Sequence, residues 1–212
     1  MSKTNLSIRS QQQDSGSPLR VPRPIKSPCV LVIEDSRSIS VVLKERLELS
    51  IGAKVTCCFT ADECHHVFAS GRGDFDVAVV DLNLPGALDG ELLDLVVRLG
   101  IPAIVFTATF DDYVRDAILE RGCADYIVKD HDSALDMVQV AVERLIGNQF
   151  FKLLVVEDGS SARHSLVTVL QRQRFQVLEA KTGLEALDIL ARHKDISLVL
   201  TDHYMPDMDG YE

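Results

Sequence analysis

Short runs of apolar residues alternate with amphipathic segments along most of the chain. The runs at 29–33, 76–80 and 101–107 are apolar at nearly every position, which is typical of strands buried on both faces of a parallel sheet. Between them, apolar residues recur at helical spacing, as at Leu43 and Leu47. The expected strands are 29–33, 54–59, 76–80, 101–107 and 125–128, and the expected helices are 36–50, 61–70, 91–99, 111–122 and 133–146. This alternation predicts an α/β fold with a right-handed, doubly wound, five-stranded parallel sheet.

Acidic residues stand directly after two of these apolar runs. Glu34 and Asp35 follow the run at 29–33, and Asp81 follows the run at 76–80. The carboxyl ends of parallel strands form the edge at which open α/β sheets bind their ligands. The three carboxylates are therefore candidate site residues, although Asp81 taken alone could simply be a loop residue that ends a strand.

The chain then repeats this pattern. The sequence LLVVED at 153–158 matches VLVIED at 30–35, and LVLTDHYMPDMDG at 198–210 corresponds to AVVDLNLPGALDG at 78–90. The spacing from acidic pair to aspartate is 46 positions in the first copy and 44 in the second. Two matches at nearly one offset indicate a tandem repeat.

The repeat divides the chain into three expected parts. Residues 1–27 are rich in Ser, Gln and Pro with few large apolar groups, so we expect a disordered leader there. The first copy is expected at 28–147 and the second at 150–212, the latter truncated after its third strand. Because that strand would be an open apolar edge, we expect the second copy to associate with another chain, giving a homodimer or aggregates.

Composition narrows the possible partners and location. The 212 residues carry a formal net charge of −10, which disfavours nucleic acid and anionic membrane surfaces. No apolar run approaches the roughly 20 residues that span a bilayer, and the polar N-terminus lacks the apolar core of a signal peptide. We therefore expect a cytoplasmic protein. The five cysteines form no CxxC pair, which fits reduced thiols.

One group of soft ligands suggests an alternative metal site. Cys57, Cys58, Cys64, His65 and His66 lie close together in the sequence, and thiolates and imidazoles are zinc ligands. Adjacent residues of a strand, however, point to opposite faces. Cys57 and Cys58 are therefore expected to be small buried apolar residues rather than ligands of one ion.

The first copy resembles the receiver domain of two-component response regulators along its whole length. The matching positions are the acidic pair after the first strand, an aspartate after the third with Pro85-Gly86 and Asp89-Gly90 beyond it, Thr107-Ala108 after the fourth, and Tyr126 three residues before Lys129 on the fifth. The resemblance implies a flavodoxin-like sheet with strand order 2-1-3-4-5. The second copy has the acidic pair, its aspartate and the sequence MPDMDG at 205–210, without counterparts of Thr107 and Lys129.

Phosphoryl transfer explains why these residue types are needed together. Carboxylates repel an anionic phosphoryl donor, and Mg²⁺ with its oxygen ligands removes this repulsion. We assign Asp35 and Asp81 as direct ligands and Asp81 as the phosphoacceptor. The resemblance implies two further ligands, the Asn83 main-chain carbonyl and Glu34 through water.

The remaining roles concern the phosphoryl group and the switch. Lys129 and the Thr107 hydroxyl are expected to contact phosphoryl oxygens, and the resemblance implies that Tyr126 moves with Thr107, although ordinary packing explains a strand tyrosine equally well. In the second copy the equivalent residues are Glu157, Asp158 and Asp202, which we assign as metal ligands, with Asp202 as phosphoacceptor. Phosphorylation would then bias the last two helical segments, whose surface is the expected output face.

The resulting prediction is a stoichiometric phosphoacceptor in a phosphorelay, supplied by a histidine kinase or phosphotransfer protein. A second hypothesis is that the chain is the regulatory part of a signalling enzyme such as a diguanylate cyclase. A third is a degenerate receiver that acts through protein contacts alone, suggested by Asp130, which stands where the family usually has proline after the lysine. The Lys129–Asp130 peptide bond is expected to be trans, or its loop strained.

Overall fold

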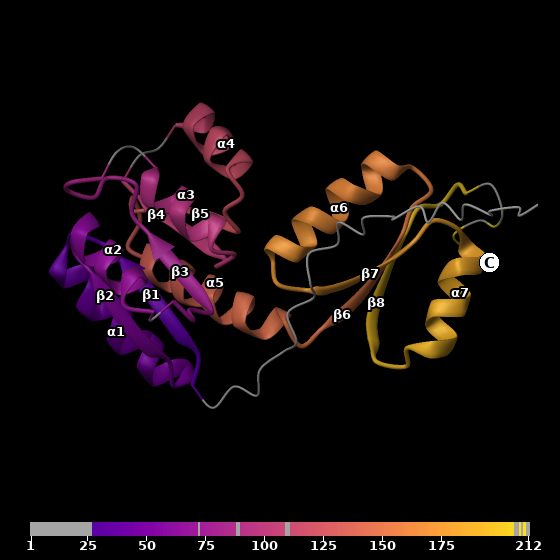
Figure 1. Ribbon diagram of the computed structural model, residues 1–212, viewed down its shortest axis with the longest axis horizontal. Coiled ribbons are helices and arrows are strands. Elements are labelled where there is room, and N and C mark those ends of the chain that lie inside the picture. Colours follow the sequence, from indigo (N-terminus) through magenta and orange to yellow (C-terminus); the bar gives the residue numbers. More distant parts are fainter. Residues whose placement is uncertain are drawn as a thin grey trace, which may run out of the picture.

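A computed structural model describes residues 27–71, 73–87, 90–108, 111–205, 208 and 210. Apart from Ser27, the expected leader lies outside these residues. The described chain forms two α/β units in succession, each built on its own parallel sheet (Figure 1). We call the part from β1 to α5 the first unit and the part from β6 to β8 the second unit.

The first unit has a five-stranded parallel sheet of order β2-β1-β3-β4-β5. Its strands are β1 (Cys29–Ile33), β2 (Lys54–Cys58), β3 (Val77–Val80), β4 (Ala103–Thr107) and β5 (Asp125–Val128). Its helices are α1 (Arg37–Ile51), α2 (Ala61–Ala69), α3 (Glu91–Arg98), α4 (Asp112–Glu120) and α5 (Ala134–Asn148). The predicted fold class and strand order are confirmed.

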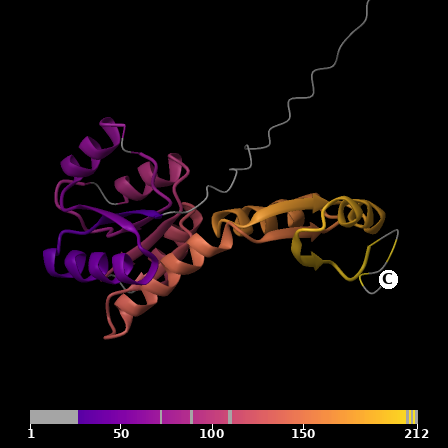
Figure 2. The same ribbon diagram turned by 90° about the horizontal axis from the view of Figure 1, so that it is seen from below.

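Helices cover both faces of this sheet (Figure 2). Side chains alternate along a strand, so Leu31 and Ile33 pack with α2, α3 and α4 on one face, whereas Val30 and Val32 pack with α1 and α5 on the other. Burial on both faces explains why β1 is a continuous apolar run rather than an alternating one.

The helix that follows the acidic pair is fixed at both ends. The Ser36 hydroxyl caps α1 by accepting a hydrogen bond from the Ile39 amide at 3.5 Å. At the other end, Gly52 has a φ of +63°, a left-handed conformation that glycine adopts without steric cost. The expected position of Asp111 inside the first turn of α4 is wrong by one residue, because its carboxylate instead caps the helix by accepting from the Tyr113 and Val114 amides.

The second unit repeats the first half of the first unit. Its elements are β6 (Lys152–Val156), α6 (Ser160–Arg172), β7 (Gln176–Ala180), α7 (Gly183–Arg192) and β8 (Ile196–Thr201). The strand order β7-β6-β8 matches β2-β1-β3 in topology and direction. Val155 packs with α6 and Leu154 with α7 on the opposite face, so the second sheet is also wound on both sides.

One strand of the second unit has an exposed edge and exposed apolar side chains. Within the described part of the chain, β8 pairs with β6 and with no other strand. Leu198, Val199 and Leu200 are 57%, 39% and 40% exposed, whereas the corresponding strand β3 is at most 1% exposed. The difference arises because β4 and the helices beside it cover β3.

The structure also bears on the expected state of the cysteines and on membrane-spanning helices. The five cysteines are free thiols, and Cys58 packs on the α2 face while its neighbour Cys57 packs on the α1 face. In the described ranges, the groups able to hold a metal ion are acidic and contain neither cysteine nor histidine. No helix within those ranges is both long enough and apolar enough to span a bilayer.

Candidate functional site

Three carboxylates meet at the carboxyl ends of β1 and β3. One oxygen each of Glu34, Asp35 and Asp81 lies within 4.8 Å of the others. Backbone hydrogen bonds set this position, because the Asp81 amide donates to the Ile33 carbonyl at 2.8 Å and the Glu34 amide to the Cys58 carbonyl at 3.0 Å. Glu34 and Asp81 are buried, whereas Asp35 is exposed. Neighbouring parallel strands thus bring the predicted acidic residues together.

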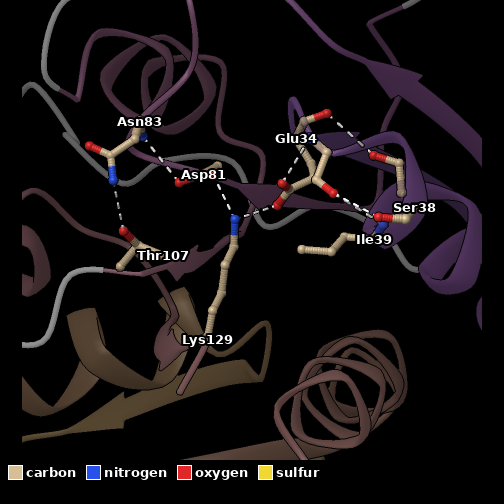
Figure 3. Close-up of polar contacts among 9 residues, drawn as sticks. Glu34, Ser38, Ile39, Asp81, Asn83, Thr107 and Lys129 are labelled. Atoms are coloured by element: carbon tan, nitrogen blue, oxygen red, sulfur yellow. Dashed lines mark hydrogen bonds and ion pairs between the residues drawn. The ribbon is translucent and has the colours of Figure 1, made fainter. Parts of the chain in front are cut away.

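Lys129 follows β5 and reaches across the sheet edge to two of these carboxylates (Figure 3). Its Nζ lies 2.6 Å from Asp81 Oδ2 and 2.6 Å from Glu34 Oε2. The Phe106 ring lies below it, with its centroid 5.1 Å from Nζ, a distance within the range of cation–π attraction. The Lys129 amide donates to the Thr107 carbonyl at 2.8 Å, which ties the lysine to the end of β4. One cation therefore balances part of the charge of two buried acids.

Glu34 is the most constrained of the acids. Its Oε1 accepts from the Ser36 amide at 3.1 Å, and the Ser40 hydroxyl donates to its main-chain carbonyl at 3.3 Å. Oε2 is buried and, despite its close ion pair with Lys129, makes no hydrogen bond of good geometry. Such an oxygen retains acceptor capacity that a hard cation could use.

Burial raises the pKa of the Glu34 carboxyl above its ordinary value of 4.5, although Lys129 opposes the shift. An acid with a raised folded-state pKa binds its proton more tightly in the folded state. As pH rises from about 4.5 through the raised pKa, the metal-free wild type should therefore lose free energy of unfolding relative to Glu34→Gln. Urea titrations of both proteins in EDTA across this pH range measure the difference. A relative gain by the wild type would contradict the assignment.

Asn83 connects the Asp81 carboxylate to Thr107. The Asn83 amide donates to Asp81 Oδ1 at 3.1 Å, and its side-chain Nδ2 lies 3.5 Å from Thr107 Oγ1 (Figure 3). Thr107 is fully buried at the end of β4. The predicted site residues at the carboxyl ends of β3, β4 and β5 thus lie in one connected group. The role of the Asn83 carbonyl as a metal ligand stays a prediction.

Tyr126 lies on β5 and takes part in different contacts. It packs against the core on the α2, α3 and α4 face and lines a pocket of about 190 Å³ with Arg115 and His131. Burial raises the pKa of its hydroxyl, with a further contribution from nearby Asp111. The expected trans bond after Lys129 is confirmed, because the described chain contains no cis peptide bond.

The second unit has an acidic group of the same kind. Glu157, Asp158 and Asp202 each place a carboxylate oxygen within 4.8 Å of the others. The Asp202 amide donates to the Val156 carbonyl at 2.9 Å, as Asp81 does to Ile33. The two sites nevertheless differ in the residue that donates to the main-chain carbonyl of the glutamate.

Two contacts around the acidic groups were missed by the sequence reasoning. Ser40 supports the Glu34 carbonyl in the first unit, and in the second unit Arg163 Nη1 donates to the Glu157 carbonyl at 2.7 Å. Arg163 is buried and also pairs with Glu179 at 3.4 Å. Both residues stand six positions after the glutamate, so aligning the two copies residue by residue would have revealed the equivalent pair.

Comparisons with known proteins agree with this arrangement. The family described as the response regulator receiver domain matches residues 30–140 and 153–212. A chemotaxis protein CheY homolog of Campylobacter jejuni is 44% identical over 62 residues, which cover 29% of this chain and 48% of that protein. The two-component response regulator ORR11 of Oryza sativa is 37% identical over 60 residues, covering 28% and 41%. The chain thus matches about half or less of the length of these curated relatives.

Two solved structures resemble the chain over most of its length. One, titled a putative two-component system response regulator/GGDEF domain protein, is 35% identical with a TM-score of 0.78, covering 87% of this chain and 74% of that one. A second, with a similar title, is 36% identical with a TM-score of 0.76 and the same coverage. The family match extends over both units and covers most of the residues. The chain belongs to the response regulator receiver domain family, the signal-transducing module of two-component systems.

Proposed function

We propose that the first unit accepts a phosphoryl group on Asp81. The observation that carries this proposal is the arrangement around that carboxylate: Lys129 Nζ lies 2.6 Å away, and Asn83 links the carboxylate to the Thr107 hydroxyl. Asp81 has one oxygen held by a backbone amide and one by a cation, so its orientation is fixed. Proximity and charge are the main contributions that a protein makes to phosphoryl transfer.

The acidic group suits a magnesium ion. Its donors are carboxylate oxygens, the ligand type that Mg²⁺ prefers, and buried Glu34 Oε2 lacks a well-formed hydrogen bond. Asp35 and Asp81 would hold the ion directly, with the Asn83 carbonyl and, through water, Glu34. When bound, Mg²⁺ supplies positive charge that offsets the repulsion between carboxylates and phosphoryl oxygens.

The transfer step follows from the same geometry. An Asp81 carboxylate oxygen forms a bond to phosphorus while the bond from phosphorus to the donor breaks, and the leaving group keeps that electron pair. The donor is phosphohistidine or a small acyl phosphate, and the product on the protein is an acyl phosphate. Lys129 transfers its contact from the Asp81 carboxylate to a phosphoryl oxygen, and the Thr107 hydroxyl donates to another. Each chain accepts one phosphoryl group on Asp81, so the unit is a stoichiometric acceptor rather than a turnover enzyme.

Phosphorylation then alters the surface formed by α4, β5 and α5. The movement of Lys129 and Thr107 pulls on the ends of β5 and β4. Tyr126 lines a pocket with Arg115, so a movement of its ring would change that pocket. The partner that supplies the phosphoryl group is a histidine kinase or phosphotransfer protein. Association with another copy of the chain stays a proposal, as does the role of Asp202 as the acceptor of the second unit.

A second candidate function is supported by the similar solved structures. Both are titled response regulator/GGDEF domain proteins and match 87% of this chain. We infer as the alternative that the two units regulate an enzyme such as a diguanylate cyclase. Sequencing the coding region beyond Glu212 decides between them, because a catalytic domain there supports the alternative and a stop codon contradicts it.

Metal dependence tests the proposed function directly. Treatment of the chain with acetyl phosphate and Mg²⁺ should add one phosphoryl group to the first unit, as measured by intact-mass spectrometry. Replacing Mg²⁺ with EDTA should remove most of this label, because the carboxylates again repel the donor. Equal labelling with and without the metal would contradict the proposed role of the acidic group.

A further inference from the structure

Three consecutive side chains, at the last residue of α6 and in the turn that leads to β7, contact the first unit. Arg172 Nη1 lies 3.4 Å from the Leu119 carbonyl, and Gln173 Nε2 donates to the Ala124 carbonyl at 2.5 Å. Arg174 Nη1 donates to the Asp76 carbonyl at 2.5 Å. We call residues 172–174 the docking turn. Figure 1 shows the corresponding end of α6 facing the first unit.

Arg174 makes the largest set of contacts in the docking turn. Besides the Asp76 carbonyl, its guanidinium lies 3.3 Å from Asp76 Oδ1 and 3.2 Å from Gln149 Oε1. Its side chain is only 11% exposed. A planar guanidinium with five donors can satisfy several acceptors at once, and here it joins β7, the start of β3 and the segment after α5.

The backbone of Arg174 is unusual in the same place. Its φ is +68°, and it is the one non-glycine residue with positive φ within the described ranges. Arginine rarely adopts this left-handed conformation, which persists where surrounding contacts compensate for it. The turn that ends α6 requires this conformation, because the Arg174 amide donates to the Gln171 carbonyl at 2.9 Å and the next amide donates to the Leu170 carbonyl at 3.2 Å. The side-chain contacts to Asp76 and Gln149 add to the compensation.

Two further hydrogen bonds complete the interface. Asn148 Nδ2 donates to the Gln173 carbonyl at 2.8 Å, and Gln176 Nε2 donates to the Gln149 carbonyl at 2.7 Å. Asn148 and Gln149 are 9% and 8% exposed, although both are polar. Asp76 is also tied to β1, because its Oδ2 accepts from the Cys29 amide at 2.9 Å. The turn therefore binds to groups that are themselves fixed in the first sheet.

We propose that the docking turn fixes the second unit on the amino-terminal end of the first sheet, and that Arg174 is the positioning residue of this interface. The partner of the surface around Asp76 is thus the second unit of the same chain, recognised by guanidinium and amide donors. Asp76 precedes β3 and Asp81 follows it, so docking uses the end opposite the acidic site. The docking contacts therefore do not involve the acidic site or its chemistry.

Residual dipolar couplings of backbone amides in the full chain test this proposal. In the wild type, couplings from both units should fit one alignment tensor, because the units turn as one body. In Arg174→Gly they should require two different tensors. Glycine accepts the positive φ, so this variant removes the contacts without adding backbone strain. Arg192→Ala serves as the control, because Arg192 is exposed and pairs with Asp188 inside α7.

A second variant approaches the interface from the other side. Asp76→Asn keeps the size of the side chain and removes the charge that faces Arg174. The alignment tensors of the two units should therefore also differ in this variant, but by less than in Arg174→Gly. Amide chemical shifts away from the interface report that both units remain folded. A wild type that needs two tensors, or an Arg174→Gly protein that keeps one, would overturn the proposal.

Discussion

The Asp81→Asn protein should incorporate no phosphoryl group into its first unit from acetyl phosphate and Mg²⁺. The amide oxygen of asparagine is a poor nucleophile, and the substitution also removes a negative charge from the acidic group. The side chain keeps nearly the same size, so the contacts of Asn83 and Lys129 lose charge but little packing. Intact-mass spectrometry of the treated wild type and variant measures the effect as the loss of one phosphoryl mass.

The second unit provides a matched control for that substitution. Asp202→Asn makes the same chemical change at the equivalent strand end, and Asp202 is not contacted by a lysine within the described part of the chain. Labelling of the first unit should persist in this variant. Undiminished label in the Asp81→Asn, Asp202→Asn double variant would refute the assignment of the acceptor.

Replacing Lys129 with methionine should strongly destabilise the metal-free first unit. Lys129 is 14% exposed and is the cation between two carboxylates that are 2% and 5% exposed. Removing one member of a buried ion pair typically costs about 3–5 kcal/mol, because the remaining charge is left uncompensated. Hydrogen exchange of amides in β1 and β3, measured in EDTA, reports the free energy of opening of this unit alone.

An exposed lysine of the same unit is the appropriate comparison. Lys44 pairs with Glu48 on α1, and their side chains are 46% and 42% exposed. Lys44→Met should therefore change the free energy of opening by only about 0–1 kcal/mol, the range for solvent-exposed pairs. Equal effects of the two substitutions would mean that Lys129 contributes no more than a surface charge.

The apolar pattern was sufficient to predict the first sheet because burial on both faces leaves few alternatives. Val30 and Ile33 pack on opposite faces, and a central parallel strand accounts for apolar residues at both. The acidic cluster followed for the same reason, since residues directly after neighbouring parallel strands must lie at one edge. The match of the second copy to the first then predicted β6, β7 and β8.

Contacts that depend on side-chain conformation were not predictable in this way. The sequence places Lys129 after a strand, but it does not say that Nζ reaches Glu34 as well as Asp81. The docking turn has a polar composition that is typical of any exposed loop. Its proposed function depends on the side-chain contacts of Arg174. The positive φ of this residue is a conformation for which the sequence signal would have been glycine or asparagine.

The most direct measurement is to locate the acyl phosphate within the chain. Borohydride reduces an aspartyl phosphate to homoserine, a stable mark that peptide mass spectrometry assigns to a single residue. After treatment with acetyl phosphate and Mg²⁺, the mark should appear at Asp81. A mark at another residue of the first unit would contradict the proposal that this carboxylate is the phosphoacceptor. The absence of any mark, at a Mg²⁺ concentration that saturates the site, would contradict it as well.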